Sequence, residues 1–499
     1  MWRLNASCLW FDEIFSVHAA RHSWPELFRF AAADIIHPPL FYALLKIWIG
    51  LGGQSVLWLR LLPLIFALLT VGPFYFLARD LKLKPAAINF SVLLMAVSGF
   101  MIKYAQEVRM YSLLLFLSVT SIWLFFRFVN TESSQHARII AVVICNLLLV
   151  YAHYYGWLLV VAELVVVLWW YRKRLASFAI GVAALLVSYV PWIYAVAVYR
   201  EPGKGLAQNI GWITRPKFSD VFEYFVQLSK PFLFSQSTLD RSEAFVSGSF
   251  VLLLLVIAIV LLYLRKVRAN SSRHVEDVLL VLLIVPLILA VALSWLLPYS
   301  IWGTRHLIAC ATPFFLLAGI AIESLRPYWA KAAILIVIGC VMTLAGAIYL
   351  IRPAPKLSWC AWDKLLSRIP ASVDTPALPV YSFEDLVAYH LWFATSETPT
   401  PHLQIKVVKG LAGVLEDPAF FLPRRFNEIE RVTPEEISGE HLWIAFRARR
   451  WDENAAPIRH VKSLGYTTQT VLSATAQGEQ VFLVELMRPS ASQRESTDR

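Results

Sequence analysis

The sequence predicts an all-α polytopic membrane bundle of about ten transmembrane helices, followed by a small C-terminal α/β domain. Of the 499 residues, 58% are hydrophobic and only 16% are charged, whereas soluble domains carry about 25% charged residues. Long apolar stretches recur up to residue 351, and most approach the roughly 20 residues that a helix needs to cross a bilayer. Beyond residue 352 the apolar runs shorten to the length of strands.

Ten stretches fit a membrane span by length and apolar content. A polar and aromatic interruption at Tyr151–Gly156 separates two of them, which could otherwise be taken for one long helix. The predicted spans are Leu57–Leu77, Pro85–Ile102, Tyr111–Val129, Ile139–Tyr154, Gly156–Tyr171, Leu175–Tyr199, Phe245–Leu264, Val278–Leu297, Leu307–Ile322 and Ala332–Ile351.

The net charge of +11 is explained by alternate loops. Lysine and arginine are enriched in the cytoplasmic loops of membrane proteins, so we predict that five basic loops are cytoplasmic. This orientation places residues 1–56 and 352–499 outside the cytoplasm, and the basic excess needs no nucleic-acid partner. The basic loops contain Arg79–Lys84, Arg127–Arg138, Arg172–Arg174, Arg265–Arg273 and Arg326–Lys331.

The N-terminal segment lacks the continuous apolar core of a cleavable signal peptide. Its predicted position outside the cytoplasm requires either a preceding span that this chain lacks or Leu57–Leu77 as a reverse anchor. Cys8 and Cys360 fall on the same predicted side, which permits a disulfide without requiring one. The other cysteines show no metal-ligand spacing, and Cys145, Cys310 and Cys340 lie in apolar runs as predicted packing residues.

Three regions follow from these patterns: a first extracytoplasmic loop (1–56), a transmembrane bundle (57–351) and an extracytoplasmic α/β domain (352–499). In the last region Ser382–Phe393 has the acidic first turn of a helix, and it alternates with short apolar runs typical of strands. The predicted strands are Ala377–Tyr381, Gln404–Val408, Leu442–Phe446 and Val481–Leu486.

The predicted first outer loop contains an acidic pair and a histidine. Asp12 and Glu13 lie between aromatic residues, where a carboxylate can act as a general base; a solvated acidic pair is the alternative. His37 precedes two prolines that favour the start of a helix, so it either donates a hydrogen bond to a substrate or caps that helix.

The second outer loop places charged residues at a membrane entry point. Glu107 and Arg109 directly precede Tyr111, the first residue of a predicted span. Arginine can bind phosphate through two parallel hydrogen bonds, although arginine and tyrosine also anchor helices at the interface.

The remaining outer loops contain His153, in an aromatic turn, and Arg305 with His306 at another membrane entry. Because all four loops share one predicted face, we predict a lipid-phosphate substrate held by arginines, with a carboxylate that activates an acceptor from the aqueous side. Within the bilayer Glu163 is either functional or a protonated acid hydrogen-bonded to a neighbouring helix.

Five motifs occur in an order that resembles bacterial glycosyltransferase family 39. These proteins are relatives of dolichyl-phosphate-mannose protein mannosyltransferases and of the lipid A aminoarabinose transferase, and they share the GT-C fold. The resemblance covers roughly Ser7 to Ile351. The motifs are Ser7–Glu13, His37–Tyr42, Leu59–Pro63, Gln106–Tyr111 and Arg305–Leu307.

The resemblance implies transfer of a sugar from a polyprenyl-phosphate donor to an acceptor outside the cytoplasm. Asp12 would be the general base, with inversion at the anomeric carbon, and Glu13 would be structural or assisting. Arg60, Arg109 and Arg305 would stabilise the charge of the departing lipid phosphate.

His37 stands where relatives place a histidine or lysine that faces the donor or acceptor. Relatives often continue Arg-Tyr where this chain has Arg305 and His306, and they carry a helix before the Asp-Glu motif. Metal dependence varies across the GT-C fold, so a divalent ion stays open; no cofactor is identified, and the chain has no DxD motif that would indicate such an ion.

Two other function classes compete with a transferase. A transporter or flippase of lipid-linked sugars would also need many helices and a phosphate site, but such proteins tend to show repeated halves with broken midplane helices. No repeat is evident, and the charged motifs lie at one predicted face. The third class is a non-catalytic scaffold whose C-terminal domain binds a partner. The acceptor is open among protein, lipid and glycan.

Overall fold

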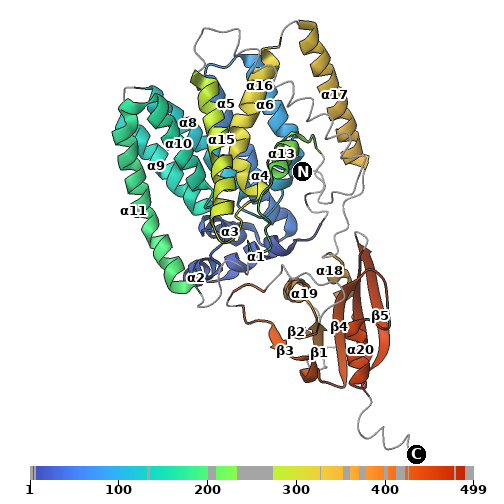
Figure 1. Cartoon of the computed structure of the whole chain (residues 1–499). Coiled ribbons are helices and arrows are strands. Elements are labelled where there is room, and N and C mark those ends of the chain that lie inside the picture. The colour runs from blue at the N-terminus through green and yellow to red at the C-terminus, as the bar shows by residue number, and fades with distance from the viewer. Residues whose placement is uncertain are drawn as a thin grey trace, which may run out of the picture. The chain divides into compact units, whose positions relative to one another are not determined.

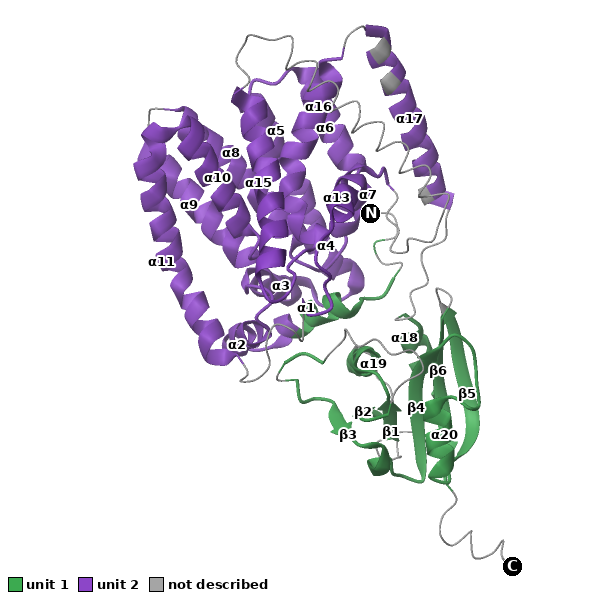
Figure 2. Ribbon diagram, in the orientation of Figure 1, with its two compact units in different colours: residues 1–18, 353–499 green, residues 19–352 purple. Residues whose placement is uncertain are grey.

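The computed structural model separates into two units, a helical unit of residues 19–352 and a sheet unit formed by residues 1–18 and 353–499 (Figure 2). The residues described are 4, 7–131, 135–200, 210–232, 274–325, 328–351, 360–369, 378–397, 403–411, 422–424, 426–476 and 479–488.

Helices make up most of the helical unit (Figure 1). Its helices, with α1 shared between the two units, are α1 (Phe11–Arg21), α2 (Trp24–Asp34), α3 (Leu40–Gly52), α4 (Val56–Leu69), α5 (Val71–Asp80), α6 (Pro85–Val97), α7 (Gly99–Tyr104), α8 (Tyr111–Asn130), α9 (Gln135–Ala152), α10 (Gly156–Trp170), η1 (Arg172–Arg174), α11 (Leu175–Tyr199), α13 (Phe218–Ser229), α15 (His274–Leu296), η2 (Thr304–Cys310), α16 (Ala311–Glu323) and α17 (Tyr328–Ile351).

Seven stretches among the described residues are long and apolar enough to cross a membrane. They are Val56–Asp80, Tyr111–Asn130, Gln135–Ala152, Arg172–Tyr199, His274–Leu296, Thr304–Glu323 and Lys331–Ile348.

Nine of the ten predicted spans coincide with helices, and Phe245–Leu264 lies outside the described residues. Two of the nine are short: α6 has 13 residues and α10 has 15. The predicted span Pro85–Ile102 is interrupted because Ser98 leaves the helical conformation and its hydroxyl accepts a hydrogen bond from the Met101 N–H, which starts α7. The first 56 residues, predicted as an outer loop with a helix starting at the two prolines after His37, contain that helix as α3 and also α1 and α2, which were not predicted.

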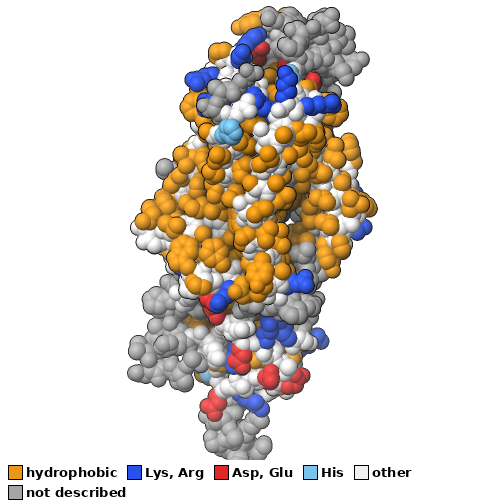
Figure 3. Space-filling model, turned by 90° about the vertical axis from the view of Figure 1, so that its left-hand side faces the viewer, with side chains coloured by type: hydrophobic (Ala, Val, Ile, Leu, Met, Phe, Trp, Pro, Cys, Tyr) orange, Lys and Arg blue, Asp and Glu red, His pale blue; other side chains and the backbone are white. Residues whose placement is uncertain are grey.

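The surface of the bundle is apolar where a soluble protein would be polar. Ile180, Val187 and Tyr194 on α11 are 71%, 70% and 69% exposed. In Figure 3 hydrophobic side chains form a broad band over this unit. Soluble monomers rarely expose so large an apolar area, so the chain is a multi-pass membrane protein.

Helix contacts hold the bundle together. Helix α8 packs against α9, α5 and α4, while α16 packs against α6 and α15 (Figure 1). Close approach of α16 and α6 depends on Gly319, because a Cβ atom there would lie 2.0 Å from the Ser91 hydroxyl oxygen. Small residues at such crossings are typical of membrane helices.

A polar cluster lies inside the bundle between α8, α9 and α10. The Ser121 hydroxyl oxygen is 2.6 Å from Asn146 Oδ1 and 2.7 Å from Glu163 Oε1, and Asn146 Nδ2 donates to Glu163 Oε2 at 2.8 Å. One hydroxyl proton cannot serve two acceptors equally. A protonated Glu163 resolves this conflict, because it donates to Ser121, which then donates to Asn146. Only with Glu163 protonated does each of the three side chains have a donor matched to every acceptor it faces.

We therefore expect Glu163→Gln to preserve the stability of the purified protein, since an amide reproduces one donor and one acceptor. Glu163→Ala should lower the free energy of unfolding by about 1–2 kcal/mol. Thermal unfolding in detergent measures both variants. Ser118→Ala on α8 is the control, because the Ser118 hydroxyl donates within its own helix to the Leu114 carbonyl oxygen. Loss of stability in Glu163→Gln equal to that in Glu163→Ala would contradict a neutral Glu163.

The sheet unit has a six-stranded sheet in the order β3-β2-β1-β4-β6-β5. The first four strands in this order are parallel, and β6 pairs antiparallel with β4 and β5. The elements are α18 (Ala361–Leu366), β1 (Leu378–Ser382), α19 (Asp385–Glu397), β2 (Leu403–Val408), β3 (Glu430–Val432), η4 (Pro434–Glu436), β4 (His441–Ala448), α20 (Ala456–Ser463), β5 (Thr467–Ala476) and β6 (Glu479–Met487).

These elements confirm the predicted C-terminal α/β domain. All four predicted strands and the predicted helix are present, whereas β3 and β5 were not predicted. Ile458 and Val461 of α20 share an apolar core with Ile444 and Phe482 of the sheet. The disulfide that the sequence permits is formed, because Cys8 and Cys360 are bonded with their Cα atoms 5.2 Å apart.

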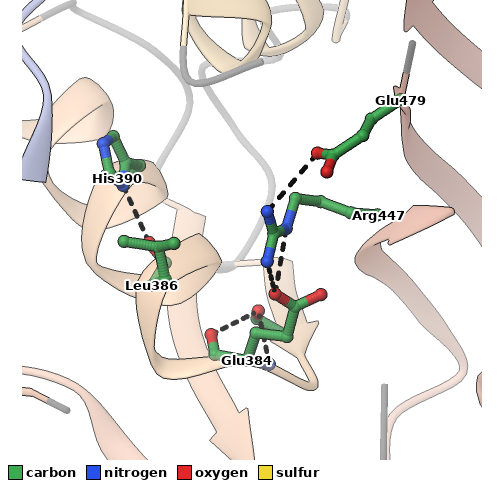
Figure 4. A network of polar contacts seen from close by, with 6 residues as sticks. Glu384, Leu386, His390, Arg447 and Glu479 are labelled. Atoms are coloured by element: carbon green, nitrogen blue, oxygen red, sulfur yellow. Dashed lines mark hydrogen bonds and ion pairs between the residues drawn. The ribbon is translucent and has the colours of Figure 1, made fainter. Parts of the chain in front are cut away.

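A buried ion pair lies at the end of β4 (Figure 4). Arg447 donates from Nε and Nη2 to Glu384 Oε2, at 2.9 and 2.5 Å, and Nη1 lies 3.4 Å from Glu479 Oε2. Figure 4 also shows His390 on α19, whose Nδ1 bonds the Leu386 carbonyl oxygen at 2.8 Å.

Stability of the sheet unit should fall on acidification because of His390. Burial lowers the pKa of this imidazole from its ordinary 6.5 to about 4, so the unfolded chain takes up its proton at a higher pH than the folded one. The contribution is present above pH 6.5 and is lost as the pH falls toward 4, by about 2 kcal/mol between pH 7 and pH 5. Amide exchange of β1 and β4 across this range should show the loss, and His390→Gln should flatten it.

Candidate functional site

Three histidines from separate loops meet at one end of the helical unit. His37 precedes α3, His153 lies in the turn between α9 and α10, and His306 lies in η2. The ring centroids of His37 and His153 are 5.5 Å apart, and those of His153 and His306 are 4.7 Å apart. One ring nitrogen from each residue lies within 4.8 Å of the others, so these are the described residues able to hold a metal ion.

Two arginines accompany the histidines. Arg109, buried in the turn between α7 and α8, places Nη2 3.3 Å from His37 Nε2. The Arg305 guanidinium stacks over the Tyr111 ring, 5.9 Å from its centroid. Loop residues that are far apart in the sequence therefore form one cationic cluster.

Two histidines of this cluster, His37 and His153, are neutral at physiological pH. Burial, followed by the charge of Arg109, lowers the pKa of His37 well below its ordinary value. Burial and the same charge lower the pKa of His153 from 6.5 to about 3, with Arg305 adding to the effect. The fixed positive charge therefore belongs to the guanidinium groups of buried Arg109 and half-buried Arg305. Two such groups favour an anion with several oxygen acceptors, such as phosphate.

Local contacts orient two of the rings. The Tyr155 N–H donates to His153 Nδ1 at 3.1 Å, and the Tyr155 hydroxyl donates to the Ile301 carbonyl oxygen. A Cβ atom at position 303 would lie 2.6 Å from His306 Nδ1, so Gly303 gives the His306 ring its place. The segment Ile301–His306 thus lies directly beside the α9–α10 turn.

Acidic residues lie beside the cluster. Asp34 Oδ2 is 4.0 Å from His37 Nδ1, and Glu107 is buried with its carboxylate 3.5 Å from Lys103 Nζ. Asp34 was missed by the sequence analysis, although its position three residues before His37 on a helix end could have indicated it. Arg60 is buried on α4.

The predicted acidic pair occupies the first turn of α1, within the sheet unit. Glu13 is buried, and its Oε2 accepts a hydrogen bond from the Trp10 backbone N–H at 3.2 Å. That contact ties Glu13 to the start of the helix. Asp12 is half-buried, and its backbone carbonyl accepts from the Ser16 hydroxyl at 3.0 Å.

The helical bundle with a C-terminal sheet domain has the GT-C fold. The chain is similar to two structures of ArnT from Cupriavidus metallidurans, one in the apo state and one bound to undecaprenyl phosphate. The apo structure has a TM-score of 0.58 at 15% identity, over 95% of this chain and 93% of that one. The bound structure has a TM-score of 0.56 at 13% identity, over 94% of this chain and 97% of the other.

An archaeal oligosaccharyltransferase, AglB from Archaeoglobus fulgidus in complex with an inhibitory peptide and a dolichol-phosphate, has a TM-score of 0.46 at 14% identity, over 79% of this chain and 60% of that one. No family model matches the chain. No curated protein matches it. The predicted GT-C fold class is confirmed by the ArnT structures, and at these identities the likeness concerns the fold.

Proposed function

We propose that this protein is an integral membrane glycosyltransferase that uses a polyprenyl-phosphate sugar as its donor. The observation that carries the proposal is the cationic cluster, in which buried Arg109 lies 3.3 Å from neutral His37 and Arg305 stacks on Tyr111. The similar fold of an ArnT structure bound to undecaprenyl phosphate supports it. The residues assigned to binding of the donor phosphate or the substrate are His37, Arg60, Glu107, Arg109, Tyr111, His153, Arg305 and His306.

The chemistry explains why guanidinium groups are needed. The donor phosphodiester carries one negative charge, and the polyprenyl phosphate that leaves carries a second once the bond from the anomeric carbon to the phosphate oxygen breaks. Arg109 and Arg305 stabilise that developing charge, which lowers the barrier. The acceptor oxygen or nitrogen forms the new bond to the anomeric carbon with inversion, and Asp12 takes the acceptor proton as general base.

The reaction is proposed to occur outside the cytoplasm, at a bacterial inner membrane. Disulfides persist in oxidising compartments, and the Cys8–Cys360 disulfide joins the segment that contains Asp12 to the C-terminal domain. Exposed basic residues such as Arg79, in the last turn of α5, and Arg172, in η1, lie in the segments that are predicted to alternate with those of the histidines. By the positive-inside rule those basic loops are cytoplasmic.

A transfer assay tests the proposal. The protein is reconstituted in liposomes with a polyprenyl-phosphate sugar labelled in the sugar and with envelope extract as the source of acceptor. We expect label to move to an acceptor fraction with release of polyprenyl phosphate in equal amount. Movement of intact donor across the bilayer without release of polyprenyl phosphate would instead indicate a transporter.

A further inference from the structure

The segment that contains Asp12 belongs to the sheet unit rather than to the helical unit. Residues 1–18 and 353–499 form one compact unit, although the whole helical unit lies between them along the chain (Figure 2). Most of α1 is therefore part of a fold whose strands come from the other end of the sequence. The sheet unit thus supports the helix to which the general base has been assigned.

A covalent bond holds the chain just before α1. The Cys8–Cys360 disulfide joins this segment to the residue that precedes α18, and the Cys8 backbone nitrogen lies 3.1 Å from Cys360 Sγ. Helix α18 packs against α19 and β5, and its residues Trp362 and Leu365 are fully buried. The start of α1 is therefore tied to a well-packed part of the sheet unit.

Tyr389 of α19 contacts α1 on both sides of Asp12. Its ring packs against Phe11, the residue directly before Asp12, with ring centroids 5.2 Å apart. Its hydroxyl oxygen is hydrogen-bonded to His18 Nδ1, further along α1, at 2.9 Å. Because Tyr389 is fully buried, this hydrogen bond is shielded from water and is stronger than an exposed one.

Several side chains of the sheet unit enclose His18. The rings of Trp392 and Phe426 make edge contacts with its imidazole, at centroid distances of 5.0 and 5.2 Å. Glu428 Oε1 lies 3.6 Å from His18 Nε2. A ring held on several sides fixes the rotation of α1 about its own axis, and that rotation decides where the Asp12 side chain points.

We propose that Tyr389 and the Cys8–Cys360 disulfide position the Asp12 carboxylate for proton transfer, so that the C-terminal domain is part of the catalytic apparatus. The inference rests on the proposed function, which assigns the general base to Asp12. Proton transfer needs heavy atoms about 2.6–3.2 Å apart, and a misplacement of about 1 Å can lower a rate by about 10²-fold. A base in the first turn of an 11-residue helix needs such support, because isolated helices of this length are marginally stable.

The first test measures transfer by two variants of Tyr389. Tyr389→Phe keeps the ring and removes the hydroxyl, so kcat should fall about 5-fold, the typical worth of one hydrogen bond. Tyr389→Ala removes both contacts, and kcat should fall by up to about 10²-fold. The KM for the donor and the binding of polyprenyl phosphate should not change, because α19 acts through Asp12 rather than on the donor.

Combination with Asp12→Asn separates positioning from general damage. In that background neither Tyr389 variant should lower transfer further, because the base that Tyr389 positions is already absent. Tyr466→Phe is the matched control, since it removes a hydroxyl that donates to the Gly439 carbonyl oxygen elsewhere in the sheet unit, and it should transfer at the parent rate. Losses that multiply with that of Asp12→Asn, or parent kcat in both Tyr389 variants, overturn the inference.

The disulfide is tested by reduction of the purified full-length protein. Reductant should lower kcat of the parent about 10-fold, within the range expected for a displaced base. The double variant Cys8→Ser/Cys360→Ser should show the same loss and no response to reductant. Cys340→Ser removes an exposed free cysteine and should respond to reductant like the parent. Parent kcat in the double variant removes the disulfide from the proposed role.

Amide hydrogen exchange of α1 reports on its anchoring without any transfer. Exchange in α1 should be faster in Tyr389→Ala and after reduction, while exchange in α20 should stay at the parent rate. Parent exchange rates in α1 of both samples overturn the inference whatever the transfer assay shows. Absence of transfer by the parent protein overturns the proposed function, and with it the purpose of the anchor but not the anchor itself.

Discussion

Replacement of Asp12 by asparagine is expected to lower the rate of sugar transfer by about 10²–10⁴-fold, the range over which a general base contributes. The amide has nearly the same size as the carboxylate but cannot accept the acceptor proton. Because Asp12 is only half-buried in the first turn of α1, the substitution should leave folding intact. Asparagine is also tolerated near helix starts.

The measurement is transfer from labelled donor in liposomes, alongside equilibrium binding of polyprenyl phosphate. Binding should be unchanged in Asp12→Asn, since the carboxylate acts on the acceptor rather than on the donor. Exposed Glu26→Gln on α2 is the matched control and should transfer at the parent rate. Full transfer activity in Asp12→Asn, with normal expression, would remove Asp12 from the mechanism.

Replacement of Arg109 by glutamine should lower the transfer rate by about 10²–10³-fold, the cost of removing one donor that stabilises developing negative charge. Here binding of polyprenyl phosphate should also weaken, because Arg109 is expected to face the phosphate rather than the acceptor. Arg109→Lys should retain part of the binding, since it keeps the charge but lacks the planar fork that matches phosphate.

A second effect separates a direct role from general damage. The charge of Arg109 is one of the causes that keep the pKa of His37 and His153 low. In Arg109→Gln these pKa values should rise, while burial, the larger cause, still holds them below their ordinary value. Exposed Arg79→Gln should show neither change. Equal loss of transfer in Arg79→Gln and Arg109→Gln would indicate a nonspecific effect of charge on membrane insertion.

Much of the fold could be predicted from hydropathy because lipid imposes a simple requirement. A backbone in the bilayer must satisfy its own hydrogen bonds, so long apolar runs become helices. This requirement located nine of the predicted spans. It says little about short helices outside the apolar runs, which explains why α1 and α2 were missed in a segment that mixes aromatic and charged residues.

In the sheet unit, too, elements made of apolar runs were predicted and the others were missed. Buried strands such as β4 and β6 have continuous apolar runs and were predicted. Strand β5 (Thr467–Ala476) is rich in threonine and serine and lies at the sheet edge, and β3 has only three residues. Pairing with a neighbouring strand defines both, and that information is absent from their own composition.

For the site, the order of spans alone determined that His37, Arg109, His153 and Arg305 share one face, because an odd or even number of crossings assigns each loop to a side. Only the tertiary structure decided that Arg109 reaches His37 and that His153 and His306 lie ring to ring. It likewise supplied Ser121 and Asn146 as the partners of Glu163. Topology follows from hydrophobicity summed along the chain, whereas contacts of a few ångströms depend on how helices cross and which side chains fill the space between them.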